Sequence, residues 1–219
     1  MLFLVRHGRT AINVGNKLQG RIDHPLDEVG RQQAIEIASV LKIIDRVISS
    51  PLIRAKQTAD AFGLPIEIDQ RFIELDYGDF DGMLQKEVPA TTWNEWRRNI
   101  NFRPPNGETL VELDVRVREA LSELSNEARS KNVVVVSHVS PIKAAIAWTI
   151  GTEIGSSWRM LLDRASISRI EITEMALRCA VLTIRHTFER FKFLAGLPSS
   201  SSTVGCQFGS CHITRCVTK

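Results

Sequence analysis

Two short runs of apolar residues constrain the fold of this chain most, because a histidine closely follows each of them. Residues 2–5 and 133–136 contain no polar side chain, as expected of strands that are buried on both faces of a parallel sheet. His7 follows the first run and His138 follows the second. The carboxyl ends of parallel strands meet at one edge of an open α/β sheet, where ligands bind. We therefore expect the two histidines at the same edge.

Helical patterns alternate with the strands. Helices are expected from Asp27 to Lys42, from Pro51 to Phe62 and over residues 108–130, where apolar residues recur in steps of three and four. A fourth helix is expected to open with Ser140 as its cap and Pro141 in its first turn. Further strands are expected at residues 45–50, 65–68, 167–172 and within 177–184, and residues 78–106 are expected to be an irregular excursion. This alternation predicts an α/β fold with a mainly parallel sheet.

Length and composition are those of one globular domain. The chain has 219 residues, of which 43% are hydrophobic and 24% are charged, so it can bury a sizeable core. No apolar run approaches the roughly 18 residues of a membrane helix, and no signal peptide is recognised, so we expect a cytoplasmic protein without a membrane partner. The domain is expected over residues 1–190, followed by a disordered basic tail over 191–219.

Charge and cysteine both concentrate near the carboxyl end. From Arg178 onward there are six Lys/Arg and one Glu, so the net charge of +3 reflects the tail and no nucleic-acid partner is expected. All four cysteines lie at or after Cys179, with spacings that match no usual zinc motif. Neither a metal site nor a cofactor is expected.

The residues after the first strand are suited to phosphoryl chemistry. His7 can act as a nucleophile, Arg6 can bind phosphate through two parallel hydrogen bonds, and Gly8 is expected to let the backbone approach a bound group. Arg54 stands in the first turns of a helix that follows a strand, and Glu74 stands in a turn-rich loop.

Several motifs together resemble one family, the histidine phosphatase superfamily, also called phosphoglycerate mutase-like or branch 1. The matching pieces are Arg6-His7-Gly8, Asn13, the segment 19–26 with Gly30, the Arg54 segment 49–59, the Glu74 loop and His138. They occur in family order over about the first 175 residues. The resemblance implies a three-layer α/β/α sandwich.

The resemblance also implies residue roles. His7 would attack phosphorus while a backbone carbonyl holds its other ring nitrogen, and Glu74 would act as general acid and then as general base. Arg6, Arg54 and His138 would supply positive charge around the transferring group. Substrate contacts are expected from Arg6, Asn13, Gln19, Gly20, Arg54 and His138.

Simpler interpretations stay open for each residue. Arg54 is also explained by a helix salt bridge, and His138 by a strand end, while Asp76, Asp79 and Asp81 compete with Glu74. The excursion carries two tryptophans and three arginines, which either line a pocket for an anionic or ring-bearing leaving group or simply pack and face solvent. These residues are Trp93, Trp96, Arg97, Arg98 and Arg103.

The sequence favours a metal-independent phosphatase acting on a small phosphorylated metabolite. His138 is followed by Val139-Ser140-Pro141, which resembles phosphatase-type members. The segment between Glu74 and Pro105 is shorter than the insertion of cofactor-dependent phosphoglycerate mutases, and this also favours hydrolysis. Such a mutase is the nearest alternative, and a non-catalytic regulator that binds phosphorylated ligands is another. The oligomeric state stays open, with a dimer as one alternative.

Overall fold

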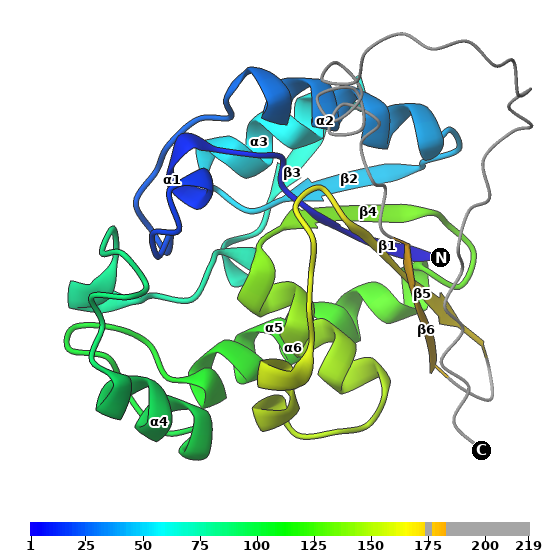
Figure 1. Ribbon diagram of the computed structural model, residues 1–219. Coiled ribbons are helices and arrows are strands. Elements are labelled where there is room, and N and C mark those ends of the chain that lie inside the picture. Colours follow the sequence, from blue (N-terminus) through cyan, green and yellow to red (C-terminus); the bar gives the residue numbers. More distant parts are fainter. Residues whose placement is uncertain (174–176, 183–219) are drawn as a thin grey trace, which may run out of the picture.

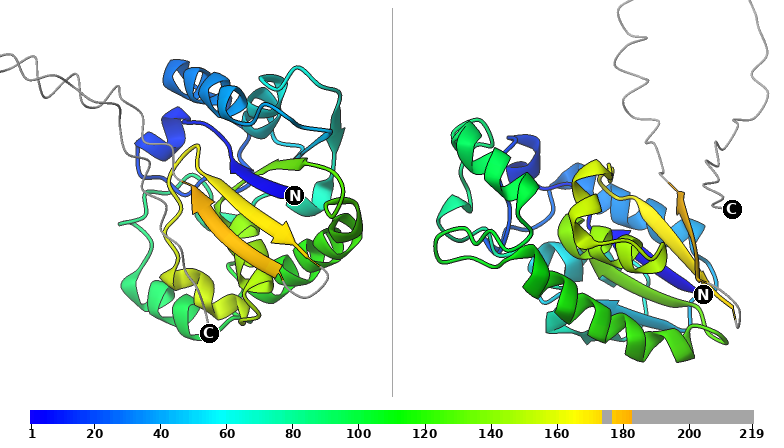
Figure 2. Two further views of the ribbon diagram at one scale, coloured as in Figure 1. Left: turned by 90° about the vertical axis from the view of Figure 1, so that its right-hand side faces the viewer. Right: turned by 90° about the horizontal axis from the view of Figure 1, so that it is seen from below.

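The computed structural model describes residues 1–173 and 177–182. Within them a six-stranded sheet runs through the middle of the molecule (Figure 1). In spatial order the strands are β3 (Ile66–Ile68), β2 (Arg46–Ser49), β4 (Val133–Ser137), β1 (Leu2–Arg6), β5 (Ile167–Ile172) and β6 (Leu177–Leu182). The first four strands are mutually parallel. Strand β5 is antiparallel to both β1 and β6. Figure 2 (left) shows β5 and β6 side by side at the edge of the sheet opposite β3.

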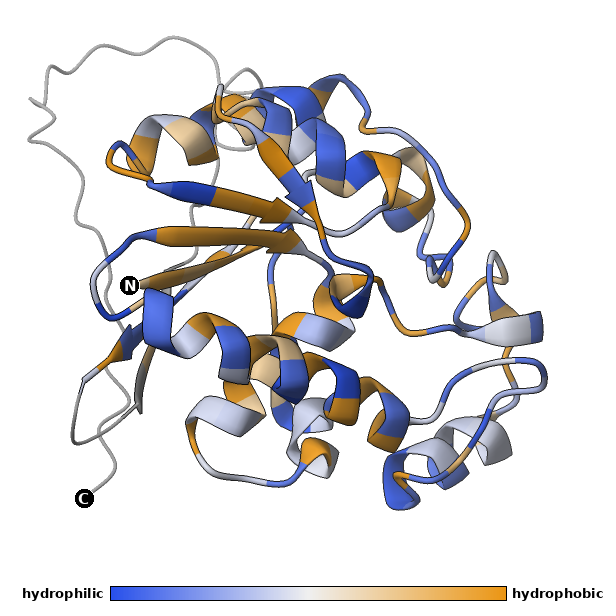
Figure 3. Cartoon of the chain, turned by 180° about the vertical axis from the view of Figure 1, so that it is seen from behind, coloured by the Kyte–Doolittle hydropathy of each residue, from blue (hydrophilic) through white to orange (hydrophobic). Residues whose placement is uncertain are grey.

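Helices cover both faces of the sheet, which confirms the three-layer prediction. Leu2 and Leu4 belong to the core under α5 (Leu110–Glu127) and α6 (Val139–Thr149). Phe3 and Val5 point the other way, toward α2 (Glu28–Val40) and α3 (Ile53–Asp60). Figure 3 shows the apolar strands lying between these two layers. The apolar runs expected to be buried on both faces are therefore buried on both faces.

The expected helix starts at Asp27 and before α5 are confirmed by their caps. The side chain of Asp27 accepts a hydrogen bond from the N–H of Gly30 at 2.8 Å. Thr109 caps α5 and exchanges hydrogen bonds with Glu112, a capping box. All apolar residues that mark the α5 periodicity are buried: Leu110, Leu113, Val117, Leu121, Leu124 and Ala128.

The start of α6 differs from the prediction. His138 is the N-cap of α6, with φ −128° and ψ −176°, and makes no side-chain cap hydrogen bond. Ser140 is already inside the helix, and the N–H groups of Val139 and Ser140 donate to the carboxylate of Glu74. A carboxylate from a distant loop therefore caps this helix, which local sequence patterns do not reveal.

The excursion is more regular than expected. Residues 78–106 contain a short 3₁₀ turn, η2 (Gly78–Phe80), and a helix, α4 (Ala90–Arg98). Trp96 of α4 is fully buried and packs against Trp93, Phe102 and Trp158. Aromatic packing stabilises this helix, which has few apolar residues apart from its two tryptophans. The remaining short elements are α1 (Ala11–Val14), η1 (Gln70–Phe72) and η3 (Ile154–Arg159).

The predicted tail lies outside the described residues. Residues 183–219 include Cys206, Cys211 and Cys216 and most of the basic side chains of the tail. Strand β6 agrees with the strand expected within 177–184 as far as Leu182. No helix in the described ranges has the length and apolarity needed to cross a membrane.

Candidate active site

The structure brings the two histidines together at the carboxyl edge of the sheet. His7 follows β1 and His138 follows β4, and these strands are parallel neighbours with Arg6 opposite Ser137. The two imidazole rings are tilted, with their centroids 5.1 Å apart. His7 is 4% exposed and His138 is 0% exposed. The register of two central strands thus places both rings in one buried polar site.

The backbone of Gly8 fixes the tautomer of His7. The Nδ1 atom of His7 lies 2.7 Å from the carbonyl oxygen of Gly8. A carbonyl only accepts hydrogen bonds, so Nδ1 carries the proton and Nε2 keeps its lone pair. The N–H of Gly8 donates to Oγ1 of Thr58 at 3.1 Å, and Thr58 donates to the carbonyl of Arg54. Helix α3 therefore holds the N–H side of Gly8, and the peptide that carries the Gly8 carbonyl is held from α2, where Oε1 of Gln33 accepts from the N–H of Arg9 at 2.8 Å.

Gly8 is required here for packing against another backbone. A Cβ atom at Gly8 would lie 2.4 Å from the carbonyl oxygen of Gly30, and one at Gly30 would lie 2.0 Å from that of Arg9. The first turn of α2 thus rests directly on the loop after β1. This contact with Gly30 is a reason for Gly8 that was not expected, and it stands beside the predicted access to a bound group.

Burial and nearby cations keep both imidazoles neutral. Burial lowers the pKa of His7 well below its usual value, and the positive charges of Arg54 and Arg6 lower it further. The pKa of His138 is likewise lowered by burial first and then by Arg54. A neutral His7 is the form with a nucleophilic lone pair.

Arg54 is fully buried and links the loop at residues 20–22 to His138. Its Nη2 donates to the carbonyl of Gly20 at 2.6 Å, and its Nη1 donates to that of Ile22 at 2.9 Å. Its Nε donates to Nδ1 of His138 at 3.2 Å. Nε2 of His138 therefore carries the proton and donates to Oγ of Ser50 at 2.6 Å. Burial lowers the pKa of Arg54.

Gly20 supports Arg54 and is in turn held by Asp81. The carboxylate of Asp81 accepts hydrogen bonds from the N–H groups of Gly20, Arg21 and Ile22, at 2.7–2.8 Å. Both backbone polar groups of Gly20 are thus used within the protein, so its expected substrate contact has no hydrogen bond to offer in this arrangement.

Three donor nitrogens among the predicted substrate contacts lack an acceptor in the described residues. They are Nε of Arg6, Nδ2 of Asn13 and Nε2 of Gln19. Nη1 of Arg6 donates to the carbonyl of Leu162 at 2.5 Å, and burial lowers the pKa of Arg6 to about 10. Unpaired buried donors cost free energy, which the oxygens of an anion would offset.

Glu74 is the acid that the structure places beside His138. It is 3% exposed, and its carboxylate accepts from the N–H groups of Leu75, Val139 and Ser140 at 2.8–3.1 Å. The start of α6 therefore directs the N–H groups of Val139 and Ser140 to Glu74. The competing acids bind elsewhere: Asp76 pairs with Arg21, Asp79 with Asn106, and Asp81 with the loop at 20–22.

Four supporting residues were not predicted. Ser50 accepts a hydrogen bond from His138, and Thr58 accepts one from the N–H of Gly8. Asp81 holds the loop at residues 20–22, whose carbonyls bind Arg54. Arg116 of α5 donates to the carbonyls of Ile73 and Glu74, at 2.8 and 3.3 Å. A partial signal exists for Ser50 and Thr58, which lie in the same segment as Arg54. Arg116 lies on a helix face with no such signal.

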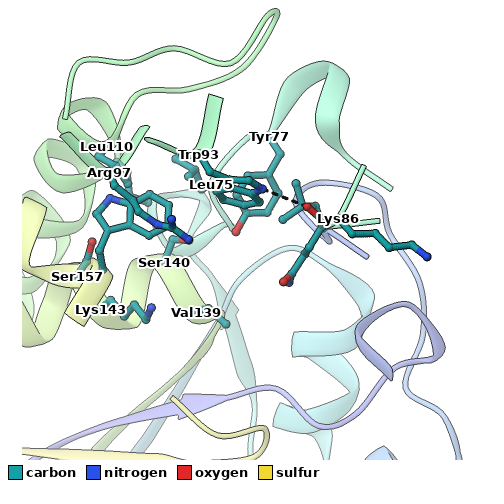
Figure 4. A pocket seen from close by; sticks show the side chains of 14 residues that line it. Leu75, Tyr77, Lys86, Trp93, Arg97, Leu110, Val139, Ser140, Lys143 and Ser157 are labelled. Atoms are coloured by element: carbon teal, nitrogen blue, oxygen red, sulfur yellow. Dashed lines mark hydrogen bonds between the residues drawn. The ribbon is translucent and has the colours of Figure 1, made fainter. Parts of the chain in front are cut away.

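A cavity of about 470 Å³ adjoins this cluster, and Figure 4 shows its lining. Three of its lining residues directly follow the catalytic candidates in the chain. Leu75 comes after Glu74, and Val139 and Ser140 come after His138, so the cavity lies next to the cluster. The two histidines do not line it. The lining residues are Leu18, Leu75, Tyr77, Gln85, Lys86, Trp93, Arg97, Leu110, Leu113, Val139, Ser140, Lys143, Ser157 and Trp158. Across residues 1–173 and 177–182, no group of three or more His, Cys, Asp or Glu side chains could hold a metal ion.

Known proteins resemble this chain in sequence and in fold. "Probable phosphoglycerate mutase GpmB" of Enterobacter sp. (strain 638) is 34% identical over 186 residues, covering 79% of this chain and 85% of that protein. A mycobacterial glucosyl-3-phosphoglycerate phosphatase solved with VO₃ superposes with a TM-score of 0.74 at 29% identity, covering 82% of this chain and 96% of that one. The alpha-ribazole phosphatase of Shigella flexneri gives a TM-score of 0.71 at 28% identity, covering 80% and 92%.

The family assignment follows from a match along most of the chain. Residues 2–185 match the family described as "Histidine phosphatase superfamily (branch 1)". The matched range contains His7, Arg54, Glu74 and His138. Relatives of this chain carry the names of phosphatases and of a mutase. The chain belongs to the histidine phosphatase superfamily, branch 1.

Proposed function

We propose that this protein is a metal-independent phosphomonoesterase that works through a phosphohistidine at His7. The observation that carries the proposal is the hydrogen bond from Nδ1 of His7 to the carbonyl of Gly8. It leaves the Nε2 lone pair available in a site that also contains Arg6, Arg54 and His138. This is the arrangement that a nitrogen nucleophile needs for attack on phosphorus.

The first half-reaction moves the phosphoryl group to His7. The Nε2 lone pair forms a bond to phosphorus while the ester P–O bond breaks, and the leaving oxygen takes a proton from Glu74. Oε2 of Glu74 accepts one N–H group whereas Oε1 accepts two, so Oε2 has the freer position for that proton. Each charge-assisted hydrogen bond from Arg6 or Arg54 to the phosphoryl oxygens contributes about 1.5–3 kcal/mol.

The second half-reaction returns the site to its starting state. Glu74, now a carboxylate, takes a proton from water as the water oxygen attacks phosphorus. The P–N bond breaks, its electrons return to Nε2 of His7, and inorganic phosphate leaves. Glu74 thus donates a proton in one step and accepts one in the next, as one group can by microscopic reversibility.

Trapping the intermediate tests this route. The enzyme is mixed briefly with a ³²P-labelled phosphomonoester, denatured, and divided between acid and alkali. A phosphohistidine survives alkali and is lost in acid, and no label is expected in His7→Ala. Label that survives acid, or wild-type enzyme that hydrolyses the ester without any label, contradicts the route. Absence of both turnover and label supports the non-catalytic regulator.

The second candidate is a phosphoglycerate mutase, which the name of the relative from Enterobacter favours. Its first half-reaction is the same, but the acceptor is a hydroxyl and not water. Release of inorganic phosphate, measured beside isomerisation of 3-phosphoglycerate with a bisphosphoglycerate primer, separates the two. We expect phosphate release to dominate, in keeping with the phosphatases among the solved relatives.

A further inference from the structure

The cavity beside the histidines is lined by positive charge. Lys86, Arg97 and Lys143 line it, and no Asp or Glu of the described residues does. The surrounding domain does not share this bias, because residues 1–177 contain 24 acidic and 22 basic side chains. A concentration of cations in a body of opposite net charge indicates an anionic ligand.

Lys143 is the least exposed of the three cations at this cavity. It lies on α6, on the same face as Val139 and Ser140, and it is half-buried. It forms no ion pair and no hydrogen bond through its ammonium group with the part of the chain that the structure describes. Burial lowers the pKa of Lys143, which reflects the cost of keeping this charge away from water, and the negative charge of Glu74 offsets only part of that shift. A bound anion would offset that cost.

Arg97 approaches the cavity from a different element. Its guanidinium lies 5.8 Å from the ring centroid of Trp93 on α4, and Trp93 is itself fixed by a 3.1 Å hydrogen bond to the carbonyl of Gln85. Within residues 1–173 and 177–182, Arg97 has no acidic partner at ion-pair distance. In Figure 4, Arg97 and Lys143 lie on one side, whereas Lys86 extends away on the other.

The rest of the lining is suited to an apolar or planar group. Trp93 and Trp158 meet edge to face at 6.2 Å, and several leucines complete the wall. Nε1 of Trp158 is a buried donor without an acceptor among the described residues. A volume of about 470 Å³ lies within the usual range for small-molecule sites, about 300–1,000 Å³. The cavity can therefore hold much more than a phosphoryl group.

We propose that Lys143 and Arg97 form a second anion subsite, which binds a carboxylate or second phosphate on the alcohol that leaves from the phosphoryl group. This inference rests on the proposed function, since it names the substrate class of the same site. The substrate is then a phosphomonoester whose alcohol carries a second anionic group on an apolar or planar body. Arg6 and Arg54 bind the transferred phosphoryl group, and Lys143 and Arg97 bind the far end.

Matched aryl esters test the subsite. The kcat/KM for phenyl phosphate is compared with that for 4-carboxyphenyl phosphate and for hydroquinone bisphosphate, which separate the carboxylate from the second phosphate. We expect at least one anionic ester to be preferred about tenfold or more, as one charge-assisted contact allows. Lys143→Met should reduce that ratio about tenfold, and Lys143→Arg should restore most of it.

A matched control excludes a general charge effect. Lys42 is exposed just beyond α2, so Lys42→Met removes the same charge elsewhere and should leave the ratio unchanged. Thermal unfolding of Lys143→Met shows that the variant is folded. A wild-type ratio near one, or a ratio unchanged in Lys143→Met, overturns the subsite while leaving the proposed phosphatase standing.

Binding separates failure of the subsite from failure of the proposed function. If no ester is hydrolysed, the phosphatase proposal fails, and quenching of tryptophan fluorescence by the same esters then tests the subsite through Trp93 and Trp158. Tighter binding of an anionic ester, lost in Lys143→Met, supports the subsite. Equal binding of all three esters overturns it.

Discussion

The two halves of the site are built from different parts of the molecule. The phosphoryl half stands on β1, β4 and α3, in the centre of the sheet, and its histidines and Arg54 are almost completely buried. The cavity half stands on α4, η3 and one face of α6, and Arg97 and Lys86 are exposed. Under the proposed function, bond breaking depends on the core of the fold, whereas choice of substrate depends on its periphery. Predictions for the two halves therefore differ in kind.

The largest effect is expected for His7→Ala. Removing the nucleophile should lower kcat by about 10⁴-fold or more for every ester, because no other described side chain supplies a bond to phosphorus at this position. His24→Ala is the matched control, since His24 lies in an exposed loop. Phosphate release is the measurement. A kcat of His7→Ala within tenfold of the wild-type value would contradict the assignment of bond breaking to the phosphoryl half.

Arg54→Met should lower kcat/KM by about 10²–10³-fold, as loss of a preorganised transition-state donor does. The loss should be equal for esters with and without a second anionic group, because Arg54 belongs to the phosphoryl half. Arg129→Met, which removes an exposed arginine, should have no effect. If Arg54→Met changed the ratio between the esters, the phosphoryl and cavity halves would not be separable.

A smaller effect is expected for Asp81→Asn. The amide can accept fewer of the three N–H groups of residues 20–22, so the loop that carries the acceptors for Arg54 is loosened. We expect kcat to fall about tenfold for all esters, as misplacement of a positioning group does within the roughly 10²-fold range. Asp79→Asn is the control. A change in KM alone, confined to anionic esters, would place Asp81 in the cavity half instead.

The smallest effect concerns stability and pH. The pKa values of His7 and His138 are lowered in the folded protein, so protonation favours the unfolded chain. Their contribution is fully present above the unfolded pKa of about 6.5 and decreases as pH falls below it. The free energy of unfolding should fall by up to about 1.4 kcal/mol per pH unit for each histidine. Thermal unfolding between pH 7.5 and 5.5 should show a shallower slope in His138→Asn, and an equal slope would contradict it.

The sequence was most informative where local pattern and position in the core coincide. Residues 2–5 and 133–136 predicted buried strands and so the meeting of His7 with His138. The periodicity of α5 was equally direct, although the helix begins two residues later than expected, at Leu110, with Thr109 as its cap. These features depend on neighbours in the chain or on the simple rule that parallel strands share a carboxyl edge.

Other features depend on partners that are distant in sequence. The carboxylate of Glu74 caps α6, so the helix starts before Ser140, which local capping rules selected. Asp81 looked like a competing acid, but it holds the loop at 20–22. Helix α4 is stabilised by the packing of Trp96 against Phe102 and Trp158, which lie outside the helix. Such long-range contacts leave little trace in a single sequence.

The contact between Gly8 and Gly30 ties reactivity to the docking of one helix. The carbonyl of Gly8 keeps the proton on Nδ1 of His7. The first turn of α2 lies directly against the backbone of Gly8 and Arg9. Detachment of α2 would remove this support, including the hydrogen bond from the N–H of Arg9 to Gln33, while leaving the sheet paired. Local opening of this layer should therefore silence the enzyme well before the domain melts, so inactivation on heating should precede the loss of secondary structure.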